Sequence, residues 1–390
     1  MGVFGLLFCL PSQPDPILSR KTFISHLRRR RLSAGMRQAV LAERLGVSRQ
    51  SLSAIEAGGQ VPSTALALEM AALLDCRVEE LFCLDTPDNM SVRLAATAKA
   101  AAPLTLARVN GNWVAHPLPS HVWAADGILG ADGASGDVVP VERLHGARGL
   151  ENHLLVAGCA PLLNLCAQRL ERMIPDVRVT WIPTTSERAL ALLDAGLVHI
   201  AGAHLSRETA PQANRERACT LDFARNGLMV HLTRWQQGFV LPPGNPAGVR
   251  GAGDLARADL RFALRAPGAV ARDVWDALRA EVGADTPPDG IHAENHQEVA
   301  NLVRYGRADI GIAIETVALD HELDFMPLTL ESFDLFCTPS PESPAALQQF
   351  LELLSNGDFR KEASRLPGYD CARMGDSSSL AESTRGRNVS

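Results

Sequence analysis

The hydrophobic positions change their spacing along the chain. Over residues 24–84 apolar side chains recur every three to four residues, which is typical of amphipathic helices. The pattern is interrupted at Gly35, Gly46 and Gly58, and glycine commonly ends helices. Ser48 stands where the N-cap of a helix is expected. This part of the chain is therefore predicted to be a cluster of short helices.

The spacing changes after residue 85. Short alternating apolar runs between 85 and 152 indicate strands, and Asn110-Gly111 between two of them is typical of a β-hairpin. From 153 onward, apolar runs alternate with amphipathic segments, which predicts an α/β domain with a mostly parallel sheet. Strands are predicted over 153–157, 177–183, 198–203, 228–232, 239–241, 260–264 and 310–314, and helices over 161–173, 186–196, 271–282, 296–305 and 344–355.

The predicted fold class is multidomain. An all-α head over 21–84 is followed by a linker with a small β-rich connector over 85–152 and by an α/β domain over 153–372. Residues 373–390 are rich in Ser, Gly and Arg and are expected to be a disordered tail, and residues 1–20 a disordered extension.

Charge separates the head from the body. The whole chain of 390 residues has a net charge of −6, yet residues 20–84 hold ten Lys and Arg against six Asp and Glu. A basic head on an acidic body indicates that only the head meets a polyanion. The alternative, in which the basic run 28–31 is merely a solvated helix face, stays open.

Cysteine and apolar content exclude several classes of protein. The eight cysteines are scattered without a C-x-x-C pair, which favours reduced thiols in the cytoplasm over a disulfide scaffold. No run approaches the ~18 apolar residues of a membrane helix, and the apolar residues 1–10 lack a basic start, so no secretory signal is expected. His292 and His296 lie four residues apart, but no third ligand is evident, and no metal site is expected. No catalytic motif is found, so an enzyme is not expected.

The stretch from Gly35 to Gly58 resembles the helix-turn-helix of the phage-repressor-like (XRE) regulators. Gln38 begins the second helix as in that family, Leu41-Ala42 matches the packing pair, and Ile55-Glu56 matches the end of the recognition helix. The resemblance implies a homodimer that places its recognition helix in the major groove of double-stranded DNA. Arg49 suits guanine and Gln50 suits adenine. The expected DNA-contacting residues are Arg37, Gln38, Ser48, Arg49, Gln50 and Ser53. Protein contact is the alternative.

The second half resembles a periplasmic-binding-protein-like domain, of the molybdate-related kind attached to cytoplasmic regulators. The matching blocks are 157–161, 200–205, 237–246, 265–272 and 308–312. The resemblance implies two α/β lobes around a cleft that binds a small anion. The expected ligand-binding residues are Gly158, Cys159, Ser186, His204, Arg265, Gly268, Arg272 and His296.

This chain departs from the family's polar cleft residues. It has Ala160 where an Asp is usual, and Ala269 and Ala271 where hydroxyl side chains are usual. Molybdate, tungstate and a larger, partly apolar organic acid therefore all remain candidate effectors. For four residues a structural role stays open: His204 as a core histidine, Arg265 in an ion pair with Asp259 or Asp273, and Gly158 and Gly268 as glycines that permit tight turns.

The sequence thus predicts a transcription regulator without a cofactor, whose effector is a small anion. Two alternatives stay open. The chain is an enzyme or carrier acting on a small acid, or a DNA-binding protein whose cleft has lost its ligand.

Overall fold

The computed structural model describes residues 22–85, 89–118, 125–130, 137–144, 150–207, 210–284 and 290–381. The expected extension over 1–20 lies outside these residues. The chain divides into two compact units, and each is described by itself. The first comprises Met1–Met90 with Asp126–Ile128 and Val141–Gly146, and the second comprises the rest.

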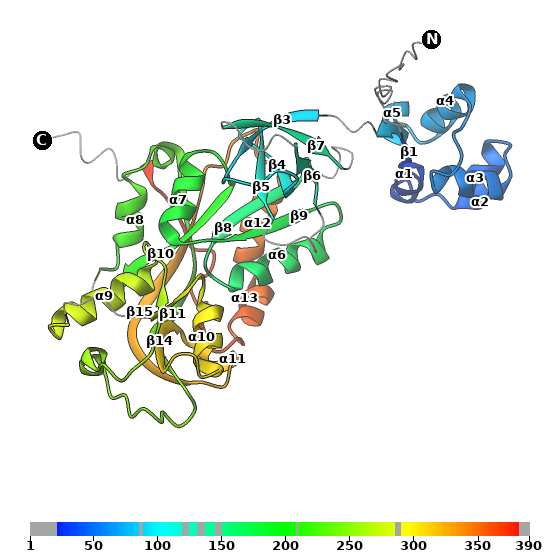
Figure 1. Cartoon of the computed structure of the whole chain (residues 1–390). Helices are drawn as coiled ribbons and strands as arrows, with labels where there is room; N and C mark the ends of the chain where they lie inside the picture. The colour runs from blue at the N-terminus through cyan, green and yellow to red at the C-terminus, as the bar shows by residue number, and fades with distance from the viewer. Residues whose placement is uncertain are drawn as a thin grey trace, which may run out of the picture. The chain divides into compact units, whose positions relative to one another are not determined.

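The first unit is a helical cluster (Figure 1). Its helices are α1 (Leu27–Ser33), α2 (Gln38–Arg44), α3 (Arg49–Glu56), α4 (Thr64–Leu73) and α5 (Val78–Leu81). Leu27, Leu41, Leu52 and Met70 are fully buried at its centre, which explains the helical spacing of the apolar residues. The sequence predicts a helix from residue 24, but β1 (Thr22–Ser25) pairs instead with β2 (Phe82–Asp85), so the ends of the cluster meet in a two-stranded sheet.

The connector contains the predicted hairpin. Asn110 and Gly111 both have positive φ, 48° and 79°, and join two antiparallel strands. The strands β3 (Asn89–Leu94), β4 (Pro103–Val109), β5 (Asn112–Pro117), β6 (Gly127–Leu129) and β7 (Val138–Arg143) form a small closed sheet in the order β3-β5-β4-β6-β7.

Buried histidines hold the hairpin of the connector to the α/β domain. His153 Nδ1 donates to the carbonyl oxygen of Leu106 over 2.6 Å. His116, on the connector, donates from Nε2 to the carbonyl oxygen of Leu197 in the α/β domain over 2.7 Å. Because His116 and His153 are 5% and 1% exposed, the connector is packed as part of the second unit at this seam.

The α/β domain has two lobes, each with a parallel three-stranded sheet. The first lobe contains β8 (His153–Gly158), β9 (Arg178–Pro183) and β10 (Ile200–Arg207), with α6 (Leu162–Met173) and α7 (Ser186–Asp194). The second contains β12 (Phe262–Arg265), β13 (Gly290–Ala293) and β14 (Ile310–Ile314), with α9 (Val270–Glu281) and α10 (His296–Arg304).

Two long strands join the lobes and make the sheet mixed. β11 (Leu228–Leu241) and β15 (Asp324–Cys337) pair antiparallel, and the strand order is β13-β12-β14-β11-β15-β10-β8-β9 (Figure 1). The sequence predicts two short strands in place of β11 and no strand over β15. The long strands cross both lobes, so the prediction of a mostly parallel sheet holds only within each lobe.

Several further elements are described in the second unit. They are α8 (Ala213–Ala218), η2 (Asp222–Asn226), η3 (Ala252–Ala256), α11 (Glu315–Asp320), α12 (Ala345–Ser355), α13 (Gly357–Ala363), β16 (Tyr369–Asp370) and β17 (Ser377–Ser379). Residues 373–381 are ordered, in contrast to the predicted tail, because Met374 and Leu380 are fully buried and β17 pairs with β11. In the part of the chain that is described, no helix has the length and apolar character needed to cross a membrane.

Candidate functional site

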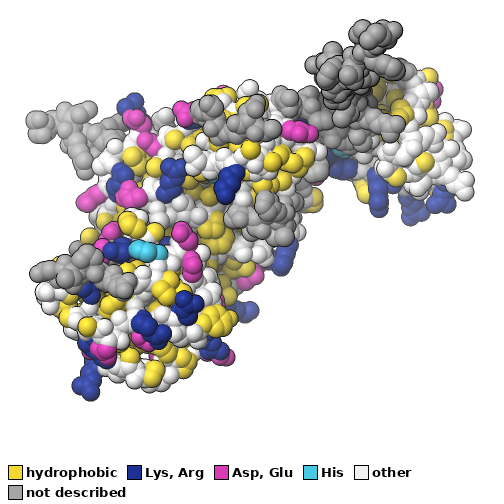
Figure 2. Space-filling model, in the orientation of Figure 1, with side chains coloured by type: hydrophobic (Ala, Val, Ile, Leu, Met, Phe, Trp, Pro, Cys, Tyr) yellow, Lys and Arg dark blue, Asp and Glu magenta, His cyan; other side chains and the backbone are white. Residues whose placement is uncertain are grey.

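The recognition helix α3 presents a polar face to solvent. Ser48 caps it, since Ser48 Oγ accepts a hydrogen bond from the backbone N–H of Ser51 at 3.0 Å. Arg49, Gln50 and Ser53 are exposed, whereas Leu52 turns into the core. Figure 2 shows basic side chains along the side of the helical unit where α1 and α2 lie. This arrangement of an exposed helix face beside positive charge suits a polyanion.

Glu56, at the end of α3, ties three helices together. Its carboxylate accepts from Arg31 Nε at 2.6 Å and from Gln38 Nε2 at 3.0 Å. The side chains of Arg31 and Glu56 are 7% and 5% exposed. Gln38, which the sequence places at DNA, is therefore also engaged within the unit, while Arg37, the N-cap residue of α2, is exposed.

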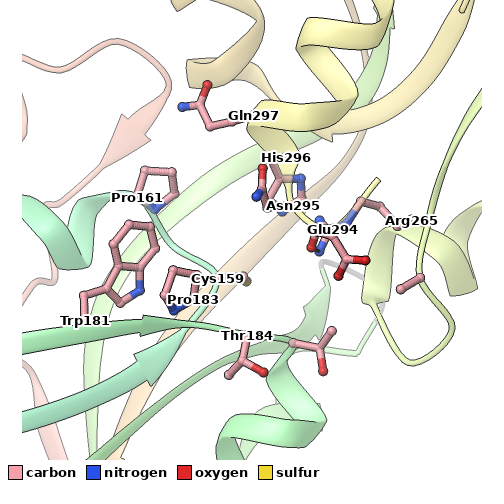
Figure 3. Close-up of a pocket in the computed structure, with 12 residues that line it drawn as sticks. Cys159, Pro161, Trp181, Pro183, Thr184, Arg265, Glu294, Asn295, His296 and Gln297 are labelled. Carbon is pink, nitrogen blue, oxygen red and sulfur yellow. Dashed lines mark hydrogen bonds between the residues drawn. The ribbon is translucent and has the colours of Figure 1, made fainter. Parts of the chain in front are cut away.

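A cavity of about 390 Å³ lies between the two lobes of the α/β domain (Figure 3). The first lobe contributes Cys159, which follows β8, and the N-terminus of α7. The second contributes Arg265, at the end of β12, and the N-terminus of α10. Among the described residues, the cavity is lined by Cys159, Pro161, Trp181, Pro183, Thr184, Thr185, Arg265, Ala266, Glu294, Asn295, His296 and Gln297.

Two helices begin at this cavity, one from each lobe. Thr185 caps α7 by accepting from the N–H of Arg188 at 3.4 Å, and Asn295 caps α10 by accepting from the N–H of Glu298 at 2.9 Å. Helix N-termini carry partial positive charge and unpaired N–H groups, so both favour an anion in the cavity.

Arg265 adds a full positive charge to the same cavity. It is 4% exposed, and its NH2 group donates to the carbonyl oxygen of Glu294 at 3.1 Å. Burial lowers the pKa of Arg265, and the nearby Cys159 side chain opposes that shift. Because Arg265 has no carboxylate partner within hydrogen-bond distance among the described residues, its charge is available to a bound anion.

Next to the cavity, His204 is held by a buried carboxylate. His204 Nδ1 donates to Glu331 Oε2 at 2.8 Å, and the two residues are 3% and 0% exposed. Burial alone would lower the pKa of His204, but the neighbouring Cys159 and Glu331 side chains raise it to about 10. The ring centroid of His296 lies 6.2 Å from that of His204. The pKa of His296 is shifted in the opposite direction: burial, together with the charges of Arg265 and His204, puts it well below the usual value.

Comparison with known proteins decides the class of the first unit. Residues 27–81 match the family described as helix-turn-helix. An uncharacterised HTH-type transcriptional regulator of Archaeoglobus fulgidus is 36% identical over 61 residues, which cover 16% of this chain and 87% of that protein. The chain belongs to the helix-turn-helix transcriptional regulators. The XRE resemblance is thereby confirmed.

The regulator's second unit matches a binding-protein family. Residues 167–355 match the family described as PBP superfamily domain. The uncharacterised protein YvgK of Bacillus subtilis is 25% identical over 226 residues, which cover 57% of this chain and 72% of that protein. The tungstate ABC transporter structure from Geobacter sulfurreducens has 15% identity and a TM-score of 0.42, over 55% of this chain and 99% of that chain. Likeness at that level says nothing about the ligand.

The regulator brings some of its predicted ligand residues together and separates others. Cys159, Arg265 and His296 line the cavity. Ser186 and His204 do not line the cavity but contact each other next to it. Ser186 Oγ accepts a hydrogen bond from the backbone N–H of His204 at 3.1 Å.

The remaining predicted residues have other neighbours. The Gly158 carbonyl accepts from Trp181 Nε1 at 2.8 Å. Gly268 is exposed with a φ of 83°, at a turn. Arg272 Nε pairs with Asp276 at 2.9 Å along α9. None of these three lines the cavity.

Sequence reasoning missed several cavity residues. Trp181, Thr184 and Gln297 line it, and Glu331 supports it from β15. A charged residue inside a buried strand is a signal that could have found Glu331, because such a residue needs a partner. Trp181 and Thr184 come from the first lobe and Gln297 from the second, and no local pattern marks them as cavity residues.

Proposed function

We propose that this regulator binds operator DNA as a homodimer in the cytoplasm and senses a small anion in the cavity between its lobes. The observation that carries the proposal is the convergence of Arg265 and the N-termini of α7 and α10 on one cavity of about 390 Å³. A buried guanidinium that has no carboxylate partner among the described residues, placed beside two helix N-termini, favours an oxyanion or a small carboxylate.

On the DNA side, we propose that α3 reads bases. Arg49, Gln50 and Ser53 lie exposed on it, while Arg37 and Ser48 stand at helix N-termini, where phosphate is favoured. Anion binding would change the affinity for DNA, and by linkage DNA would change the affinity for the anion by the same factor.

The DNA arm of the proposal is tested with a pool of random duplexes at low salt, followed by titration of the selected sequence. Arg49→Ala is expected to reduce affinity for the selected sequence at least tenfold and to relax base preference, since a bidentate contact is worth about 1–3 kcal/mol. Arg77→Ala is the matched control, because the Arg77 side chain is 80% exposed in the same unit and lies outside α2 and α3. Equal losses in both variants would contradict readout by α3.

The effector arm is tested by thermal unfolding of the full chain with molybdate, tungstate, phosphate, sulfate and small carboxylic acids. A ligand at 100 times its Kd stabilises by about 2.7 kcal/mol. Arg265→Gln is expected to abolish the shift. Arg272→Gln is the matched control, since Arg272 pairs with Asp276 and does not line the cavity.

Other outcomes of these experiments favour the alternatives. A shift that persists in Arg265→Gln would contradict the proposed site. No shift with any anion would favour a ligand-blind DNA-binding protein. Turnover of a stabilising acid would favour an enzyme.

A further inference from the structure

Three metal-ligating side chains meet at the wall of the cavity. They are Cys159, which follows β8, His204 on β10 and His296 at the start of α10, and their Sγ and ring nitrogen atoms lie within 4.8 Å of one another. Ligand atoms around a tetrahedral Zn²⁺ with bonds of about 2.0–2.3 Å lie roughly 3.5 Å apart. A small contraction of the cluster would therefore bring all three atoms to bonding distance.

The ring of His204 is already oriented for this role. Nδ1 donates to Glu331 Oε2 at 2.8 Å, so Nε2 is the ring nitrogen that would bind a metal ion, and the ion would displace the proton from it. A carboxylate on the far nitrogen is the usual partner of a metal-ligating histidine, because it selects the tautomer and makes the ligand more basic. Glu331 is fully buried and also accepts from Trp235 Nε1 and Gln237 Nε2, each at 3.3 Å, so its position is fixed by three donors.

His296 is the second observation that points to a ligand. It is 2% exposed, and neither ring nitrogen has a hydrogen-bond partner among the described residues. Leaving such a group unpaired in a buried place costs about 1–3 kcal/mol. A metal ion bound by one ring nitrogen would remove part of that cost. Figure 3 shows Cys159 and His296 among the residues around the cavity.

A divalent ion in this cluster needs negatively charged ligands, because a positive charge lies nearby. Arg265 lies beside the cluster and repels a bare cation. A bound ion would displace the proton of the Cys159 thiol, so the resulting thiolate would oppose that repulsion, and Glu331 lies on the far side of His204. One thiolate with two imidazoles is a donor set that suits Zn²⁺ better than Mg²⁺ or Ca²⁺.

We propose that Cys159, His204 and His296 bind one Zn²⁺-like ion, with its fourth coordination position open to the cavity. Three protein ligands and one open position are typical of sites that exchange their fourth ligand. Because Cys159 and His204 belong to the first lobe and His296 to the second, the ion would link the two lobes. The proposal goes beyond the proposed function and does not depend on which anion the cavity accepts.

The test uses Co²⁺ as a spectroscopic probe in the full, reduced and chelator-treated chain. We expect one ion per chain, with a thiolate-to-cobalt charge-transfer band in the near ultraviolet, and displacement of Co²⁺ by Zn²⁺. Cys159→Ser should abolish the charge-transfer band, and His296→Asn should weaken affinity at least tenfold. Glu331→Gln should also weaken affinity about tenfold through the orientation of His204.

Matched controls separate this site from adventitious binding to other thiols and imidazoles. Cys219→Ser and His292→Asn should keep the band and the affinity, since Cys219 is a free thiol outside the cluster and His292 is exposed. A band that survives Cys159→Ser, or no band in the wild-type chain, would overturn the proposal. If His296→Asn does not fold, as judged by circular dichroism, the Cys159→Ser spectrum decides alone. Neither readout involves DNA or the anion, so failure here is distinct from failure of the proposed function.

Discussion

Arg31 and Glu56 form a buried ion pair between α1 and α3, with Arg31 Nε 2.6 Å from Glu56 Oε1. Removing one partner of such a pair leaves an uncompensated buried charge, which costs about 3–5 kcal/mol. Glu56→Ala is therefore expected to lower the free energy of unfolding of the helical unit by that order, and Gln38 would lose a partner as well.

Far-ultraviolet circular dichroism in denaturant is the suitable measurement, because residues 22–85 contain no tryptophan. Glu69→Ala is the control, since Glu69 is exposed on α4. An equal effect of the two substitutions would contradict the role assigned to the ion pair.

The seam between connector and first lobe is predicted to weaken in acid. Burial lowers the pKa of His116 to about 4 and that of His199 to about 4. His199 Nδ1 accepts from the N–H of Leu155 at 2.9 Å, so the neutral ring is the form that fits. Below pH ~6.5 the unfolded chain binds protons that the folded chain excludes, so stability falls by about 1.4 kcal/mol per pH unit and histidine until pH ~4.

Denaturant unfolding at a series of pH values between 7.5 and 4.5 measures this loss. His116→Gln should reduce the slope by one proton, because glutamine keeps a donor for the Leu197 carbonyl without titrating. His292→Gln is the control at an exposed histidine. If His116→Gln leaves the slope of the wild-type chain unchanged, the acid loss arises elsewhere.

Gly238 permits the close pairing of β11 and β15. A Cβ at this position would collide with the carbonyl oxygen of Met326, and the pairing register shifts between Gln237 and Gly238. Gly238→Ala is expected to destabilise the chain by about 1–3 kcal/mol, as overpacking does.

Gly357→Ala is the matched control, since a Cβ there meets nothing within 4 Å and Gly357 begins α13. It should be neutral or slightly stabilising. Tryptophan fluorescence during urea unfolding measures both variants, and a Gly238→Ala midpoint equal to the wild-type one would rule out the collision.

The sequence predicts β14, whose burial is uniform, and misses β15, whose burial is mixed. β14 is found at its observed bounds, 310–314, because every residue in it is buried and apolar. β15 is missed because Pro327 and Glu331 interrupt its apolar run. Glu331 is explained by its partners His204, Trp235 and Gln237 on other strands, and His204 is 127 positions away in the chain. Polar residues in the linking strands serve partners on other strands, and no local pattern reveals that.

The sequence predicts only those residues of the candidate site that lie in a recognisable segment of one lobe. The loop after β8 and the start of α10 are recognised from the sequence, so Cys159 and His296 are expected at the cleft, where they lie. Trp181 and Thr184 carry no such signal. Trp181 is placed by its hydrogen bond to the Gly158 carbonyl on the neighbouring strand, which no local pattern reveals. The sequence predicts that Arg272 contacts the ligand. In the structure, Arg272 instead pairs with Asp276, one turn further along α9.

Ser48 offers a way to separate a structural role from a DNA-binding one. Its Oγ caps α3 by accepting from the N–H of Ser51 at 3.0 Å, and its side chain is also exposed where we propose that phosphate lies. Ser48→Ala should lower stability by about 1 kcal/mol. Ser48→Asp should keep stability, because aspartate also caps a helix and suits the positive helix N-terminus.

On DNA, an acidic cap (Ser48→Asp) and a neutral cap (Ser48→Asn) should differ. Ser48→Asp is expected to lose at least tenfold in affinity, because its carboxylate would face a phosphate, whereas the neutral cap Ser48→Asn should bind like the wild-type chain. Fluorescence anisotropy with the selected duplex, alongside circular dichroism for stability, measures both. If Ser48→Asp binds DNA as tightly as Ser48→Asn at low salt, where phosphate repulsion is least screened, then Ser48 only caps the helix and the phosphate lies elsewhere.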